Sequence, residues 1–245
     1  MQSERTTDAL PYDPRVASNA RALDAITREI VDCRACPRLV AWREQVARDK
    51  RAAYQDDEYW GRPVPGFGDP DARVLVVGLA PAAHGGNRTG RVFTGDRSGD
   101  WLFASMHRTG FANQPVSVGR ADGLALKDAY VAAAVRCAPP DNKPTHDERD
   151  RCAPYLAREI AALGALQVVV ALGGFAYEVT LRLLAAGGAS APRPRPKFGH
   201  GVEVETGAVT VITSYHPSQQ NTFTGRLTEP MLDDVFLRAA DVVRG

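Results

Sequence analysis

The pattern of apolar positions predicts a mixed α/β fold for most of the chain. Short continuous apolar runs are typical of buried parallel strands, and they cover residues 73–78, 129–135, 167–172 and 208–213. Helical periodicity lies between or after these runs, over residues 100–109, 146–163, 175–186 and 232–243. Strands that alternate with helices predict βαβ units and a parallel sheet covered by helices on both faces.

The region before the first strand has a different pattern. Residues 18–32 are predicted to form a helix with one apolar face and with Ser18 as its N-cap. A second helical stretch follows Pro37, and a loop rich in glycine and proline covers residues 61–70. The polar segment 1–17 is expected to be a flexible tail, so residues 18–245 would form a single domain.

Ligands of open parallel sheets bind at the carboxyl ends of the strands, so the loops after the strands are expected to carry chemistry. The loop after the first strand, residues 78–99, is rich in glycine and arginine, which suits close contact with phosphate. It contains neither the dinucleotide glycine fingerprint nor the Walker pattern. Asp96 or Ser98 could also simply cap the helix that begins near residue 100.

Two further loops present candidate site residues. The turn-rich segment after the second strand holds Asn142, whose amide could pair with both the donor and the acceptor edge of a base. Spacing alone would favour an ordinary Asx turn as the explanation of Asn142. After the last strand, His216 precedes a proline within a polar segment, and a histidine at this place in an α/β sheet is a candidate site residue.

The four cysteines have a spacing that favours a metal centre. Cys33 and Cys36 form a C-x2-C pair, while Cys137 and Cys152 are separated by fourteen residues near the ends of predicted elements. This spacing suits zinc or iron–sulfur chemistry, although the second pair fits a zinc ribbon poorly. Four free buried thiols are the alternative. A redox C-x-x-C site is disfavoured because no thioredoxin-like strand precedes Cys33.

Composition narrows the class further. The chain has 44% hydrophobic and 24% charged residues, and no apolar run approaches the roughly 18 residues of a membrane span. The N-terminus does not resemble a secretory signal, so we expect a cytoplasmic protein. A net charge of +1 argues weakly against nucleic-acid binding, so phosphate contacts would have to come from local arginines and backbone amides. Residues 187–199, where prolines alternate with basic residues, look like a stiff basic surface loop.

Together these residues resemble the uracil-DNA glycosylase superfamily, specifically its iron–sulfur branch, families 4 and 5. The resemblance rests on the order of the cysteines, on the Gly-x-Ala-Pro motif at residues 78–81 and on the His-Pro-Ser motif at 216–218. It covers roughly residues 33–221. Family 4 has an acidic residue directly after its Gly-Glu-Ala-Pro-Gly motif, whereas Ala82 and Ala83 follow Pro81 in this sequence. The run at residues 84–91 is similar to the corresponding run of family 5. The sequence therefore resembles family 5 more than family 4.

The resemblance implies a three-layer α/β/α sandwich around a four-stranded parallel sheet. It implies a [4Fe-4S] cluster held by the four cysteines, which would tie the N-terminal helices to the domain. It also implies a monofunctional DNA-repair glycosylase that removes uracil and related damaged bases, such as hypoxanthine, and leaves an abasic site. The expected partner is uracil-containing DNA, single- or double-stranded, and the expected state is a monomer without membrane contact.

The resemblance and the loop chemistry together suggest roles for individual residues. Asp96 would orient the water and stabilise the sugar cation, Asn142 would hold water or base, and His216 would donate a hydrogen bond to the uracil oxygen. The other base contacts would come from Phe93, as the stacking aromatic, and from Gly78, Ala80, His84 and Asn87. The DNA contacts would come from Arg88, Arg91, Arg97, Ser218 and Gln219, with residues 218–224 as a wedge beside the extruded base.

Two other functions are compatible with parts of the pattern. A Rossmann-type nucleotide-binding protein would use the glycine-rich loop for phosphate, but the missing glycine fingerprint counts against it. A non-catalytic zinc or iron–sulfur module could bind DNA without cutting it. Base excision in a gel assay separates that module from an enzyme.

Overall fold

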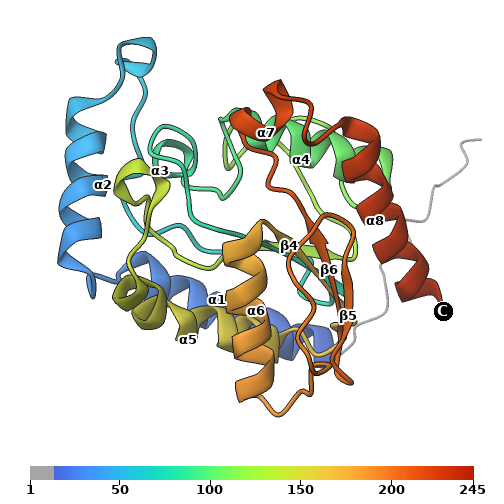
Figure 1. Cartoon of the computed structure of the whole chain (residues 1–245). Coiled ribbons are helices and arrows are strands. Elements are labelled where there is room, and N and C mark those ends of the chain that lie inside the picture. Colours follow the sequence, from blue (N-terminus) through green and yellow to red (C-terminus); the bar gives the residue numbers. More distant parts are fainter. Residues whose placement is uncertain (1–13) are drawn as a thin grey trace, which may run out of the picture.

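The computed structural model describes residues 14–245 (Figure 1). These residues are built around one six-stranded sheet. The strand order is β1-β3-β2-β4-β6-β5. The four central strands run parallel, and they are β3 (Ala129–Ala133), β2 (Val74–Gly78), β4 (Val168–Leu172) and β6 (Thr210–Ser214). The predicted four-stranded parallel sheet is thus confirmed as the centre of the fold.

Two short edge strands extend this centre and were not predicted. β1 (Phe67–Gly68) pairs with β3, and β5 (Glu203–Glu205) pairs with β6, both antiparallel. Strands of two and three residues are too short to produce a recognisable period, and β1 lies inside the glycine- and proline-rich loop. The sheet is therefore mixed at its edges, although the predicted boundaries of the central strands hold to within two residues.

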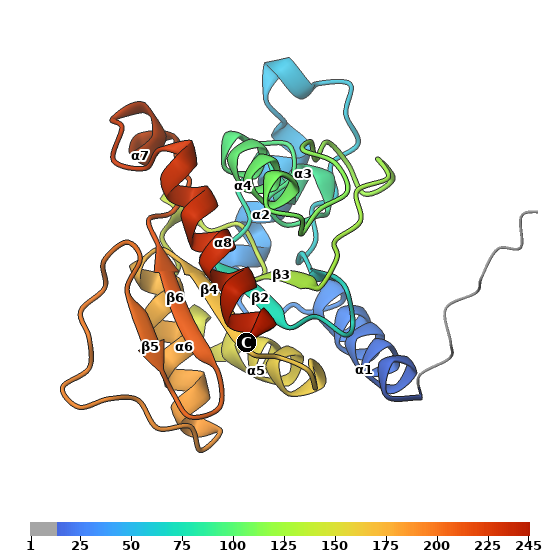
Figure 2. The same ribbon diagram turned by 90° about the vertical axis from the view of Figure 1, so that its right-hand side faces the viewer.

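Helices cover both faces of the sheet, which gives the predicted three layers (Figure 2). Every residue of the four central strands is buried. Along β2, for example, Val74 and Val76 face one helix layer, and Leu75 and Val77 face the other. The first layer contains α4 (Arg97–Arg108) and α8 (Glu229–Arg244), and the second contains α1 (Pro14–Val31), α5 (His146–Ala162) and α6 (Gly174–Ala186).

The N-terminal helix begins earlier than the sequence pattern predicts. α1 starts at Pro14, so Ser18 lies inside the helix and is not its N-cap. Proline is well tolerated in the first turn of a helix, whereas the apolar face that guided the prediction begins only after that turn. Residues 1–13 of the predicted flexible tail lie outside the described residues, and 14–17 are helical. None of the described helices is long and apolar enough to cross a membrane.

Of the remaining elements, α3 and α7 lie near the carboxyl ends of the central strands (Figure 1). α2 lies beside α3, away from the sheet, and α7 follows β6. These elements are α2 (Pro37–Asp49), η1 (Ala52–Tyr54), α3 (Gly86–Thr89), η2 (Pro140–Asn142) and α7 (Gln219–Phe223). The parallel order therefore brings the loops after β2, β3 and β6 to the same edge, as the sequence predicts.

Candidate active site

A cleft of about 860 Å³ opens at the carboxyl ends of the central strands. Its walls come from the loops after β2, β3 and β6 and from the N-terminal region. The predicted site residues that line it are Ala80, His84, Phe93, Asp96, Arg97, Asn142, His216, Ser218 and Gln219. Trp42, Arg51 and Tyr54 also line it and were missed, because aromatic and basic residues in that stretch share no recognisable motif.

Asp96 both caps a helix and lines the cleft. It is the N-cap of α4, and its Oδ1 accepts a hydrogen bond from the Gly99 N–H at 3.1 Å. The capping role weighed from the sequence is therefore present. The other oxygen packs against the backbone at Gly85, where a Cβ would lie 2.0 Å from Oδ2. Burial raises the pKa of Asp96, although backbone N–H groups of Gly99 and Ser98 partly oppose this. A raised pKa makes this carboxylate a stronger proton acceptor than a fully exposed one.

Phe93 forms a platform in the wall of the cleft. Its φ of 53° lies in the left-handed region that bulky residues rarely adopt, and such strain concentrates at functional sites. The ring stacks on the His216 ring at a centroid distance of 5.8 Å. A Cβ at Gly78 would lie 2.5 Å from the Phe93 ring, so this glycine makes room for the ring. Gly78 itself is not among the residues that line the cleft, and its role as a base contact stays a prediction.

His216 lies half-buried behind Phe93, in the cleft wall. Burial lowers its pKa to about 4, so the imidazole is neutral near neutral pH. Its backbone oxygen accepts hydrogen bonds from the Ser218 N–H at 2.7 Å and from Asn221 Nδ2 at 2.9 Å, which fix the turn. None of the described residues hydrogen-bonds its ring nitrogens. A neutral imidazole N–H is therefore available to a ligand in the cleft.

Asn142 reaches the cleft from the loop after β3. It is exposed and has a φ of 55°, next to Asp141 at 53°, which is a conformation that Asn and Asp tolerate better than other residues. Its side-chain amide makes no hydrogen bond to any described residue, so the Asx turn considered from the sequence is not formed. The amide is free to contact a ligand.

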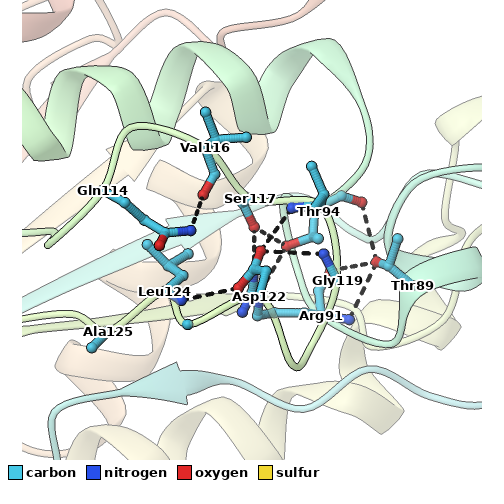
Figure 3. Close-up of polar contacts among 12 residues, drawn as sticks. Thr89, Arg91, Thr94, Gln114, Val116, Ser117, Gly119, Asp122, Leu124 and Ala125 are labelled. Atoms are coloured by element: carbon cyan, nitrogen blue, oxygen red, sulfur yellow. Dashed lines mark hydrogen bonds and ion pairs between the residues drawn. The ribbon is translucent and has the colours of Figure 1, made fainter.

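Arg91 is buried in an internal network, so its prediction as a DNA contact is wrong. Its side chain is 6% exposed, and one terminal nitrogen donates to Asp122 at 2.5 Å and to Ser117 at 2.7 Å. Its Nε donates to Thr94 at 3.0 Å (Figure 3). With these donors pointing inward, the guanidinium cannot reach a phosphate. The network instead ties the loop after β2 to the segment 117–122.

The hydrogen bonds around Asp122, including the one from Arg91, favour the ionised form of its carboxyl group. Burial by itself would raise the pKa of Asp122. The hydrogen bond from Arg91 and those from the backbone N–H groups of Leu124, Val118 and Gly119 outweigh burial, so this pKa lies well below its ordinary range. The pair is therefore ionised at neutral pH.

Asn87 and Arg88 also face inward, which corrects two further predictions. Asn87 is buried and its Nδ2 donates to the backbone oxygen of Arg43 at 3.1 Å, so it joins α3 to α2 and does not line the cleft. Arg88 donates to Asp57 at 2.6 Å, and its guanidinium lies 3.9 Å from the centre of the Tyr54 ring. It also donates to two carbonyl oxygens of its own loop, at residues 84 and 95. Both side chains hold the loop in shape.

Arg97 and Ser218 lie at the rim of the cleft beside α7. Arg97 is exposed, stacks over Phe223 at 4.4 Å and donates to Thr222 at 3.3 Å. The Ser218 hydroxyl caps α7 by accepting from the Asn221 N–H. Phe223 is 65% exposed. The rim therefore carries an exposed aromatic ring held by a cation, next to the polar turn.

The four cysteines are free thiols and line one small cavity between α2, the segment after β3 and α5. Among the described residues, no three His, Cys, Asp or Glu side chains are grouped to hold a single metal ion. A cubane cluster differs from a single ion because each of its four irons takes one cysteine, which spreads the sulfurs apart. Four cysteines around one cavity match the number of protein ligands that such a cluster takes.

Hydrogen-bond donors surround the sulfurs. An Arg43 terminal nitrogen donates to Cys137 Sγ at 2.8 Å, and the Arg136 backbone N–H donates to Cys152 Sγ at 3.2 Å. Both guanidinium groups are nearly fully buried, and Arg43 Nε and Arg136 Nε and Nη1 have no hydrogen-bond partner in the described chain. Arg136 is already paired with the buried carboxylate of Glu159, so Arg43 is the buried cation that fits an anionic thiolate-bound group in this cavity.

The fold and the cleft agree with a comparison to known families. The uracil DNA glycosylase superfamily model matches residues 65–239, and the chain belongs to this superfamily. The type-5 uracil-DNA glycosylase of Mycobacterium bovis is 55% identical over 226 residues, which are 91% of this chain and 83% of the relative. The type-5 enzyme of Thermus thermophilus is 47% identical over 88% of this chain and 96% of its own length.

The type-4 branch is more distant. The type-4 uracil-DNA glycosylase of Archaeoglobus fulgidus is 29% identical over 198 residues, covering 80% of this chain and 82% of the relative. The predicted similarity to family 5, with family 4 as the next relative, is confirmed.

Proposed function

We propose that the protein is a DNA-repair glycosylase that hydrolyses the N-glycosidic bond of uracil and related damaged bases, leaving an abasic site. The observation that carries this proposal is one cleft that contains a partly buried carboxylate, an aromatic platform and a neutral histidine. The type-5 relatives support it, because their similarity extends over about nine-tenths of the chain.

The aromatic platform and the histidine would act on the base. A base inside a duplex has to leave the stack to be reached, and the extruded ring would lie against Phe93. Cleavage of the glycosidic bond leaves negative charge on the base, and His216 would donate a hydrogen bond where that charge grows. One preorganised donor is worth about 3 kcal/mol. Because its pKa is about 4, the imidazole donates in its neutral form.

The carboxylate would act on the water and the sugar. Asp96, ionised above its raised pKa, would orient the attacking water and stabilise the cationic sugar that develops in the transition state. Asn142 would hold the water or the base edge with its free amide. This division keeps the anionic group on the cationic side of the breaking bond and the hydrogen-bond donor on the anionic side.

Uracil excision by the purified protein tests the proposal, and a His216→Leu variant assigns the activity to the cleft. We expect the wild type to release uracil from a labelled duplex, and the variant to lose about 100- to 1000-fold in single-turnover rate. His107→Leu, an exposed histidine on α4, is the matched control and should keep the wild-type rate. Alkali-labile sites in the same duplex reveal the product. An inactive wild type, at saturating enzyme, contradicts the proposed function.

We further propose that Cys33, Cys36, Cys137 and Cys152 hold a [4Fe-4S] cluster. The shared cavity and the buried Arg43 guanidinium that donates to Cys137 Sγ support this assignment. When bound, the cluster would serve as a covalent cross-link among separate parts of the chain. Its ligands come from the α1–α2 turn, the segment after β3 and α5, so it would hold the N-terminal helices on the domain.

Metal analysis tests the cluster. Protein purified without oxygen should be brown and contain about four irons per chain. Cys137→Ser should lose most of the iron and the visible absorption, and its thermal midpoint should fall, because the cross-link between the loop after β3 and the N-terminal helices is broken. Ser105→Ala, at a buried site distant from the cysteines in the α4 layer, should keep the iron content. Colourless protein that contains zinc would contradict the assignment.

A further inference from the structure

The stiff basic loop recognised in the sequence folds back along α6. The Tyr177 hydroxyl donates to the Pro196 carbonyl oxygen at 2.6 Å, and the Phe198 ring packs on the Tyr177 ring at a centroid distance of 6.0 Å. The loop, α6 and the first turns of α5 enclose a groove of about 520 Å³. This groove is separate from the cleft, with which it shares no lining residue.

The groove carries an excess of positive charge. Its cations are Arg149, Arg182, Arg195 and Lys197. Arg149 and Arg182 share one acid, Asp150, at 2.8 and 2.5 Å. Glu178 is the only acid among the lining residues. Arg195 and Lys197 are exposed and have no hydrogen bond or ion pair with any residue that the structure describes. A local excess of this kind is notable in a chain whose net charge is only +1.

The groove adjoins the cleft on two sides. The Phe198 ring packs against the Tyr215 ring at 6.2 Å, and Tyr215 directly precedes His216 of the cleft. On the other side, Arg149 of the groove lies in the first turn of α5, seven residues after Asn142 of the cleft. The ring contact and the short connection place the groove next to the segments that carry Asn142 and His216.

We propose that the groove binds the phosphate backbone of the DNA that flanks the excised base. This inference rests on the proposed function, which supplies the polymer. Arginine and lysine side chains suit phosphate, and such contacts are independent of sequence. The prolines at 192, 194 and 196 limit the freedom of the backbone that carries Arg195 and Lys197, which reduces the entropy lost on binding. Because Tyr177 is buried, stacking on bases is not part of the contact.

The salt dependence of DNA binding tests this proposal. Log affinity falls with log salt, and each phosphate contact makes this slope steeper by about 0.9. The slope of the Arg195→Gln/Lys197→Gln double variant should therefore be shallower than that of the wild type by about 1.8. Between about 50 and 200 mM salt, the wild type should therefore lose about tenfold more affinity than the variant. The probe is a long duplex with a central abasic-site analogue, measured by fluorescence anisotropy.

Controls separate the groove from net charge and from the cleft. Arg238→Gln/Arg244→Gln removes two cations from α8, on the opposite face of the sheet, and should keep the wild-type slope. On a short duplex that reaches only the cleft, the groove variant should bind like the wild type. Its single-turnover excision at saturating DNA should also be unchanged, which shows that the cleft is intact.

The outcomes distinguish this proposal from the proposed function. If the groove variant keeps the wild-type salt slope on the long duplex, the proposal is overturned, and it is equally overturned if the groove variant and the α8 variant lose the same slope. Binding of polyglutamate that depends on Arg195 and Lys197, with no change in DNA binding, would assign the groove to an acidic protein partner instead. If the protein does not excise uracil but the groove variant still has the shallower salt slope, the groove proposal stands and the proposed glycosylase function is overturned.

Discussion

Asp96→Asn should lower the single-turnover rate of uracil excision by about 10²- to 10⁴-fold and leave the fold intact. A neutral amide cannot accept the proton of the attacking water or balance the positive charge of the sugar. The substitution nevertheless keeps the structural role of the side chain, since Asn caps a helix about as well as Asp and can still accept from the Gly99 N–H. The measurement is cleavage of a uracil duplex at saturating enzyme, alongside a thermal unfolding curve.

The first turn of α4 offers a matched control. Asp100 is an exposed acid four residues after Asp96 and is not among the residues that line the cleft. Asp100→Asn removes the same charge from the same turn, and we expect it to keep the wild-type excision rate. An Asp96→Asn enzyme that works nearly as fast as the wild type would show that this carboxylate is only a helix cap.

The pH dependence provides an independent signature of the same group. Burial raises the pKa of Asp96 above the usual value of about 3.9, and the ionised form is the active one. Excision should therefore decline as the pH falls through this raised pKa. His216, whose pKa is about 4, stays neutral until the pH falls to that value. The residual activity of Asp96→Asn should lack the acid limb that Asp96 causes in the wild type.

The central strands and the location of the cleft could be predicted because both follow from strong local signals. A parallel strand buried on both faces requires a continuous apolar run, and the carboxyl ends of such strands necessarily meet at one edge. Asp96, Asn142 and His216 come from different loops after these strands, and all three line the cleft. The edge strands β1 and β5 carry no such signal, because two or three residues cannot display a period.

The direction of a side chain within a loop was much harder to predict. Arg88, Arg91 and Arg97 lie within ten residues of each other and look equivalent in the sequence. The first two are held by acids 31 residues away, Asp57 and Asp122, and only Arg97 remains exposed at the rim. Such distant pairings depend on tertiary structure, which a local pattern does not contain. For the same reason the motif around Phe93 did not reveal its left-handed backbone.

Arg91→Met should lower the free energy of unfolding by about 3 to 5 kcal/mol, because it leaves a buried charge without its partner. The side chains of Arg91 and Asp122 are 6% and 7% exposed. Urea unfolding followed by circular dichroism measures the change. The control is Arg108→Met, which breaks the more exposed ion pair with Asp233 and should cost less than about 1 kcal/mol.

The pH dependence of this loss identifies its cause. The pKa of Asp122 is depressed in the wild type, so the ion pair contributes stability above the unfolded pKa of about 3.9, and that contribution is lost as the pH falls through the folded pKa. In Arg91→Met the deficit should therefore be largest at neutral pH and should shrink below about pH 4, where the stranded carboxyl becomes protonated.

A second substitution separates the stranded charge from lost packing. Arg91→Met/Asp122→Asn should recover part of the deficit at neutral pH, because it removes the buried charge and keeps one acceptor oxygen, enough for the Val118 and Gly119 N–H groups that share Oδ2. A deficit that is the same at neutral and acidic pH, with no recovery in the double variant, would mean that Arg91 stabilises the loop through packing alone. Phe93 and Asp96 lie two and five residues beyond Arg91, so the ion pair stabilises the same loop that carries the platform and the carboxylate.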